Sequence, residues 1–240
     1  MAEPALWTEE GIYQRMVQTI RDHQLQPGTK LIEDRLASAF GVSRTRIRPV
    51  LARLASEKVV TLTPNRGATV ARPTEQESRE VFEVRRLIEP TLIAAFMERA
   101  SASEMQVLEN CIVQEEAARS LGDQPLAIRL AGEFHLHIAQ VAQHQTLGRI
   151  LGELVSRTSL ILMSYGAQSR AASSEPGGCG CHDHRALLDA MRLGDTATAT
   201  RLMQEHLSSV EAQLHFGLPT SESPDFRTLF QTPHAPSVAD

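Results

Sequence analysis

The chain has 240 residues, with 42% hydrophobic and 22% charged residues and a net charge of −5. This length allows two domains that each bury a core, and no apolar run approaches the roughly 18 residues of a membrane helix. The N-terminus lacks the basic and apolar segments of a secretory signal, and 3 cysteines are too few for a disulfide framework. We therefore expect a cytoplasmic protein with no membrane partner.

Charge is divided unevenly along the chain. Residues 1–73 carry 11 Lys and Arg against 7 Asp and Glu, a net charge of +4. Residues 74–240 carry 13 against 22, a net charge of −9. A basic part beside an acidic one indicates that only the first part meets a polyanion.

Three helical patterns and one hairpin pattern fill the first 73 residues. The helical patterns are TEEGIYQRMVQTIRDHQL, IEDRLASAF before Gly41, and RTRIRPVLARLASEKVV after Ser43. Pro49 lies deep in the third, where we expect it to distort the helix locally. The runs VVTLT and ATVAR, joined by PNRG, predict a β-hairpin in which Gly67 takes a positive φ. This order predicts a winged helix-turn-helix over residues 1–73.

The exposed side of the third helix is rich in arginine. It carries Arg44, Thr45, Arg46 and Arg48 within five residues, and Arg66 lies at the tip of the hairpin. Arginines at the N-terminal end of a recognition helix pair with guanine edges or phosphates in the major groove of double-stranded DNA. The alternative is a solvated basic face, but the arginines coincide with the recognition position.

The run LQPGTKLIEDRLASAFGVSRTRIRPVLARLASEKVVTLTPNRGATV resembles the N-terminal domain of GntR-family regulators. The resemblance implies DNA contacts from Arg44, Thr45, Arg48 and the wing at Gly67. Where many members have proline this chain has Arg46, and where alanine is common it has Pro49. These differences leave the operator sequence open.

Residues 74–218 are predicted to be entirely helical, and residues 219–240 are predicted to form a loose C-terminal tail. Apolar residues recur every three or four positions, and glycine and proline supply the breaks. The predicted helices lie near residues 75–100, 103–121, 124–143, 145–168, 180–193 and 195–216.

Three segments resemble the FCD effector domain of the FadR-like branch of GntR regulators. They are EVRRLIE, GEFHLHIAQVAQH and HDHRALLDAMRLGDTATATRLMQEHL. The resemblance implies a mostly α protein, with an all-α bundle that encloses a ligand pocket, often holds a divalent metal, and forms a homodimer.

The metal ligands that the resemblance implies are His135, His184 and His206, for one zinc or nickel ion per chain. The family's first ligand is an Asp, and its position here is Ala131. Cys181 or His182 is a candidate replacement, and the role of Cys179 and Cys181 stays open. The alternative is that the three histidines are structural, as hydrogen-bonded core residues or a surface cap.

Arg85 is the implied effector-binding residue, because its guanidinium can hold a carboxylate through two hydrogen bonds. The alternative is an ion pair with Glu89, one turn along the same helix.

The sequence therefore predicts a DNA-binding transcription regulator, a repressor released by a small carboxylate effector. One alternative is a helical domain that only dimerises. Another is a metal-dependent enzyme, which we do not expect because neither Glu133 nor Glu205 is placed to act as a general base.

Overall fold

The structure is a computed structural model that describes residues 7–64, 66–166 and 180–216, without the side chains of residues 180 and 181. Among the described residues, contacts divide the chain into two units, one of residues 7–20 with Gln24–Ala71, the other of Arg21–His23 with residues 72–216. The predicted tail, residues 219–240, lies outside the described residues. None of the helices described is long and apolar enough to span a membrane.

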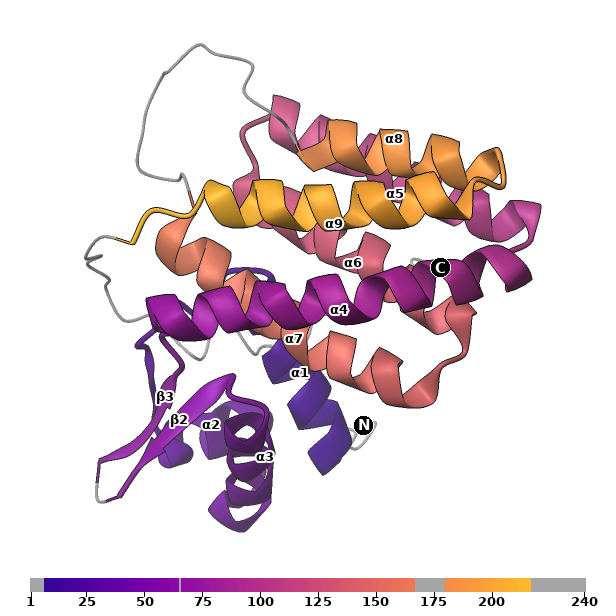
Figure 1. Cartoon of the computed structure of the whole chain (residues 1–240). Helices are drawn as coiled ribbons and strands as arrows, with labels where there is room; N and C mark the ends of the chain where they lie inside the picture. Colours follow the sequence, from indigo (N-terminus) through magenta and orange to yellow (C-terminus); the bar gives the residue numbers. More distant parts are fainter. Residues whose placement is uncertain (1–6, 65, 167–179, 217–240) are drawn as a thin grey trace, which may run out of the picture. The chain divides into compact units, whose positions relative to one another are not determined.

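The described part of the N-terminal unit holds three helices and a small antiparallel sheet in which β3 lies between β1 and β2. Its elements are α1 (Glu9–Arg21), β1 (Lys30–Leu31), α2 (Glu33–Phe40), α3 (Arg44–Ser56), β2 (Val60–Thr63) and β3 (Gly67–Val70) (Figure 1). The predicted helix-turn-helix and wing are confirmed. The strand β1 was not predicted, because a two-residue strand has no periodicity in its sequence.

The turn between α2 and α3 depends on Gly41. This residue ends α2 with a φ of 64°, in the left-handed region that costs other residues about 1–2 kcal/mol. The turn lets both helices bury their apolar faces in one core, with Leu36 and Phe40 from α2 and Ile47 and Leu54 from α3 at most 3% exposed.

Pro49 does not interrupt α3. The helix is continuous from Arg44 to Ser56, and Pro49 lies on its exposed side. Proline removes one backbone hydrogen bond, but Ile47, Val50 and Leu51 on the opposite face are at most 2% exposed. Burial of this face holds the helix together across Pro49.

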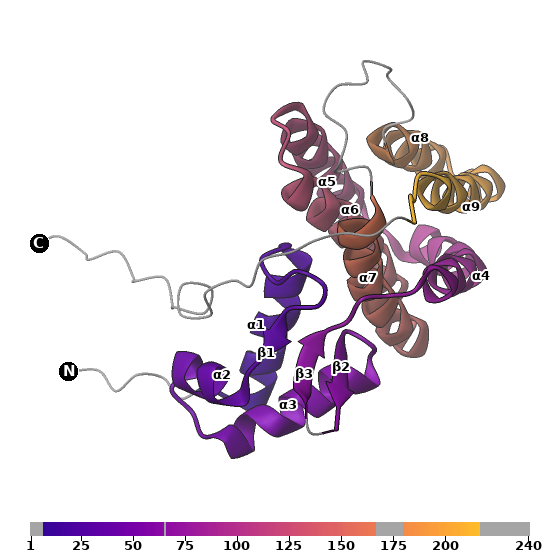
Figure 2. The ribbon, with the colours of Figure 1, turned by 90° about the vertical axis from the view of Figure 1, so that its left-hand side faces the viewer.

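The C-terminal unit is a bundle of helices. Its elements among the described residues are α4 (Glu75–Arg99), α5 (Ala102–Ser120), α6 (Gln124–Ala142), α7 (Gln145–Tyr165), α8 (Gly180–Arg192) and α9 (Thr196–Ala212). Viewed from one end, α6 packs against α4, α5 and α7, and the pair α8–α9 lies against α5 and α4 (Figure 2). Each helix lies within about four residues of its predicted bounds.

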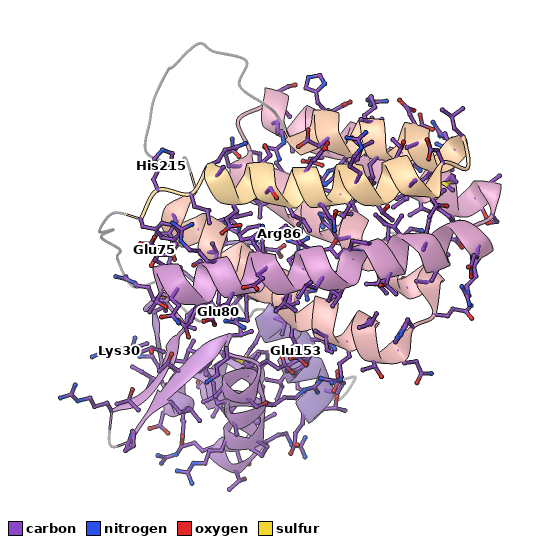
Figure 3. All side chains as sticks on the ribbon, viewed as in Figure 1. Lys30, Glu75, Glu80, Arg86, Glu153 and His215 are labelled. Carbon is purple, nitrogen blue, oxygen red and sulfur yellow. The ribbon has the colours of Figure 1, made fainter. Side chains whose placement is uncertain are left out.

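Apolar side chains from every helix of the bundle meet in one core, in which Phe82, Phe96 and Phe134 are fully buried. Polar contacts fasten the helices at the surface. Arg86 projects from α4 toward α9 (Figure 3), where its Nη1 donates to Oε2 of Glu211 at 2.6 Å. The arrangement brings residues from α4, α5, α6, α8 and α9 to the interior of the bundle.

Candidate DNA interface and candidate metal centre

The exposed face of α3 carries Arg44 and Arg48, as predicted. Nε of Arg44 lies 2.7 Å from Oδ1 of Asp34, and Nε of Arg48 lies 2.9 Å from Oε2 of Glu33. Both arginine side chains are about 60% exposed, at 58% and 62%. These arginines are therefore held by the first turn of α2 but remain open to a ligand from solvent.

Arg46 lies in a different environment from its two neighbours. It is half-buried, and its Nη1 donates to the backbone oxygen of Trp7 at 2.9 Å. The Trp7 ring packs edge-on against Phe40, with 5.2 Å between ring centroids. Arg46 thus fastens the segment before α1 to α3. Thr45 is exposed, and its Oγ1 lies 2.6 Å from Oγ of Ser43.

The wing is the β2–β3 hairpin. Arg66 is exposed, its backbone N–H donates to the oxygen of Thr63 at 3.0 Å, and Gly67 takes the predicted positive φ, 84°. The hairpin thereby presents Arg66 at the turn.

The three predicted histidine ligands lie together inside the helical unit. His135 on α6, His184 on α8 and His206 on α9 are 3%, 1% and 6% exposed. Each offers one ring nitrogen, and these atoms lie within 4.8 Å of one another. Residues 71 positions apart in the sequence thus form one buried cluster.

A carboxylate contacts Nδ1 of each histidine. Nδ1 of His135 lies 2.6 Å from Oε2 of Glu89, and Nδ1 of His184 lies 2.8 Å from Oε2 of Glu115. Nδ1 of His206 lies 3.1 Å from Oδ2 of Asp183. Ionised carboxylates only accept hydrogen bonds, so each Nδ1 is a donor, and Nε2 is the nitrogen left for a ligand.

The protonation states agree with these contacts. Burial lowers the pKa of His135 to about 3 and that of His206 to about 4, so both rings are neutral near pH 7. Burial opposes ionisation of Glu89, but Arg85 and the contact with His135 outweigh it and lower the pKa to about 2. Contacts with His184 and Arg119 likewise lower the pKa of Glu115 to about 2, against the effect of burial.

Nothing described fills the position of the missing Asp ligand. Ala131 has no donor atom, and Glu133 pairs with Arg129 on its own helix. The His182 side chain is exposed, whereas the histidine cluster is buried, so the hypothesis that His182 replaces the Asp has no support. The Cys179 residue and the Cys181 side chain lie outside the described residues.

Arg85 is 3% exposed and pairs with Glu89, the alternative that the sequence left open; its Nε lies 2.6 Å from Oε1. Nη1 donates to Oγ1 of Thr158 at 3.3 Å. Nη2 is buried and has no hydrogen-bond partner among the described residues. The ion pair thus uses part of the guanidinium and leaves one buried donor.

Sequence reasoning missed the contacts of Glu115 and of the acidic pair Glu33 and Asp34. Glu89 was found only as a partner of Arg85, one helical turn away. Glu115 and His184 are 69 residues apart, and no local spacing connects them. Only an alignment or the fold itself brings such residues together.

A winged helix-turn-helix that exposes arginines on its third helix defines a class of DNA-binding proteins. Residues 8–70 match the family described as bacterial regulatory proteins, gntR family, and residues 80–209 match the FCD domain. The chain belongs to the FCD-containing branch of the gntR family and is a DNA-binding transcription regulator.

The curated relatives are themselves named as transcription regulators. The chain is 27% identical over 191 residues to the Nta operon transcriptional regulator of Aminobacter aminovorans, covering 78% of this chain and 87% of that protein. It is 26% identical over 225 residues to the repressor NanR of Salmonella newport, covering 86% and 85%.

Solved structures show the same fold. McbR/YncC of E. coli has a TM-score of 0.74 at 20% identity, over 88% of this chain and 97% of that one. A GntR regulator from Rhodococcus sp. RHA1 has a TM-score of 0.73, also at 20% identity, over 85% and 96%.

Proposed function

We propose that this chain is a repressor that binds an operator through α3 and its wing and leaves it when a small carboxylate binds the helical unit. The observation that carries the DNA contact is the exposure of Arg44 and Arg48 on α3. We assign base or phosphate contacts to Arg44, Thr45 and Arg48, and a phosphate or minor-groove contact to the wing at Arg66 and Gly67.

Arg46 stays a predicted DNA contact, but unlike Arg44 and Arg48 it already donates a side-chain hydrogen bond to the backbone. Its Nη1 is used by the Trp7 oxygen. A guanidinium carries five N–H donors, so the remaining ones can reach a phosphate without breaking that bond. We expect Arg46 to contribute less to sequence specificity than Arg44 or Arg48.

The histidine cluster fits a divalent cation. His184 Nε2 is buried without a hydrogen-bond partner among the described residues, which is costly unless another ligand satisfies it. Three neutral imidazoles are suited to zinc or nickel, and the spacing of their ligand atoms is one that a single ion closes by small side-chain movements. We propose that His135, His184 and His206 bind one such ion per chain.

The effector is proposed to be a carboxylate because of the charges around this cluster. A divalent ion held by three neutral ligands keeps its full charge and has open positions for an anion. Nη2 of Arg85 is a buried donor without a partner among the described residues, and it can donate a hydrogen bond to the second oxygen of the same carboxylate.

We propose a homodimer that presents two α3 helices about one DNA turn apart and binds a short palindrome. We propose that residues 1–73 of each chain bind DNA and that residues 74–218 bind the effector and form the dimer. The dimerisation-only alternative does not explain why Arg85, Glu89 and Glu115 are buried. A cytoplasmic location stays a prediction.

Two measurements test this function. Selection of duplexes from a random pool by the untagged protein is expected to enrich a palindrome, and failure to enrich any sequence would contradict the operator proposal. Elemental analysis before and after dialysis against chelator is expected to find about one zinc or nickel per chain. Protein that never contains or takes up metal would show that the loss of the Asp ligand at Ala131 has inactivated the site.

A further inference from the structure

Glu89 and Glu115 make the same set of contacts on two different helices. Oε1 of Glu89 pairs with Arg85 one turn away on α4, while Oε2 accepts from His135 on α6. Oε1 of Glu115 pairs with Arg119 one turn away on α5, at 2.7 Å, while Oε2 accepts from His184 on α8. Each carboxylate therefore connects an arginine of its own helix to a histidine of a neighbouring helix.

Both carboxylates are buried, and a buried ion pair costs free energy of desolvation, so stability alone does not account for these contacts. Glu89 is 2% exposed and Glu115 is 0% exposed. Taking a charge out of water costs several kcal/mol, and replacing a buried ion pair by apolar residues is often neutral or stabilising. Two buried pairs that both end on histidines of one cluster point to a role in orienting those rings.

We propose that Glu89 and Glu115 are positioning residues that fix His135 and His184 as Nδ1–H tautomers, so that both Nε2 atoms face the common point of the cluster. Asp183 orients His206 in the same way but less strongly, because the distance between Nδ1 and Oδ2 is 3.1 Å and the Asp183 side chain is 34% exposed. Carboxylates that accept from a ligand histidine orient the ring and strengthen it as a ligand. This inference rests on the proposed metal site.

The arrangement also accounts for a site without the Asp ligand. Each oxygen of Glu89 and of Glu115 contacts an arginine or a histidine, and neither carboxylate belongs to the group of ligand atoms that lie within 4.8 Å of one another. The negative charges of these carboxylates thus lie behind the histidine rings and do not coordinate the proposed ion. The ion keeps its open positions, and the three rings stay in place before it binds.

Adjacent residues on α5 supply a matched control. Glu115 contacts His184, whereas Glu116 pairs with Arg185, the next residue of α8, with 2.7 Å between Oε2 and Nη2. Glu115→Gln and Glu116→Gln each remove one carboxylate charge from α5 and replace one acceptor oxygen that can face α8 by an amide NH2 group. Only the first contact ends on a histidine of the cluster.

The experiment measures affinity for cobalt(II) by its visible absorption, and for zinc by competition with a chromophoric chelator. Glu115→Gln is expected to weaken both about 10- to 100-fold, and Glu116→Gln to leave them within twofold of wild type. Glu115→Gln is the primary variant because Arg119, left without its partner, is 28% exposed in its side chain and can be hydrated. Equal affinity of the two variants would overturn the proposal.

A second readout does not need a metal. In the metal-free wild type, long-range ¹H–¹⁵N spectra of histidine-labelled protein are expected to show His135 and His184 protonated at Nδ1 and unprotonated at Nε2. Nε2–H tautomers would overturn the inference, whether or not metal binds. Absence of cobalt binding to wild type, with Nδ1–H tautomers present, would contradict the metal site and leave the positioning role standing.

Discussion

Nε of Arg44 lies 2.7 Å from Oδ1 of Asp34, so the first arginine of α3 is already paired with α2 in the free protein. Arg48 is paired with Glu33 in the same way. Exposed ion pairs contribute little, about 0–1 kcal/mol, and therefore yield easily to a phosphate or a base. Until then the two carboxylates hold the guanidinium groups in place and add negative charge to the surface that we propose contacts DNA.

Arg44→Ala and Arg48→Ala are each expected to weaken operator binding about tenfold or more, since a good arginine–guanine pair discriminates by about 1–3 kcal/mol. Fluorescence anisotropy on the selected duplex measures the effect. Arg201→Ala serves as the control, because Arg201 is exposed and pairs along α9 with Glu205, in the helical unit. Unchanged affinity in both α3 variants would show that α3 is not the recognition helix.

Asp34→Asn is expected to tighten binding to non-specific duplexes several-fold, because it removes a negative charge and frees Arg44 for a phosphate. One extra phosphate contact steepens the dependence of log affinity on log salt by about 0.9. Titrations at several salt concentrations measure both effects. Glu205→Gln removes a carboxylate from a similar exposed pair on α9 and is expected to change neither. If the two variants behave alike, Asp34 does not restrain DNA binding.

Gly41→Ala and Gly152→Ala are expected to shift stability in opposite directions. An added Cβ meets nothing within 4 Å at either position, but Gly41 has a φ of 64° whereas Gly152 lies inside α7. Backbone strain is expected to cost Gly41→Ala about 1–2 kcal/mol, while Gly152→Ala gains up to about 1 kcal/mol of helix propensity. Differential scanning calorimetry measures both, and a higher midpoint for Gly41→Ala would contradict the αL turn.

His184→Ala combined with His206→Ala is expected to abolish copurifying metal, because one remaining imidazole cannot hold the ion. Chelator should lower the thermal midpoint of the wild type, since a ligand that binds only the folded state stabilises it, and should leave the double variant unchanged. His137→Ala is the control: this histidine is two residues from His135 but pairs with Glu104 at 2.8 Å. Full metal content in the double variant would place the site elsewhere.

Local patterns determined the elements of this protein. Gly41 and Ser43 bound the turn between α2 and α3, and apolar residues spaced three and four apart gave the helices of both units, because helix periodicity and left-handed backbone are properties of short segments. The same periodicity predicted a helix through Pro49, where burial of Ile47, Val50 and Leu51 offsets the loss of one hydrogen bond.

The three histidines were predicted as metal ligands from the resemblance of the sequence to the FCD domain. The fold brings all three together. Which nitrogen each presents was decided only by the tertiary structure, since Glu115 reaches His184 across 69 residues and from another helix. Ion pairs such as Arg44–Asp34 are likewise invisible in sequence, because the strength and partner of a charge depend on distance and burial in space. The sequence thus determined the family and the residue types, and packing of the helices decided their contacts.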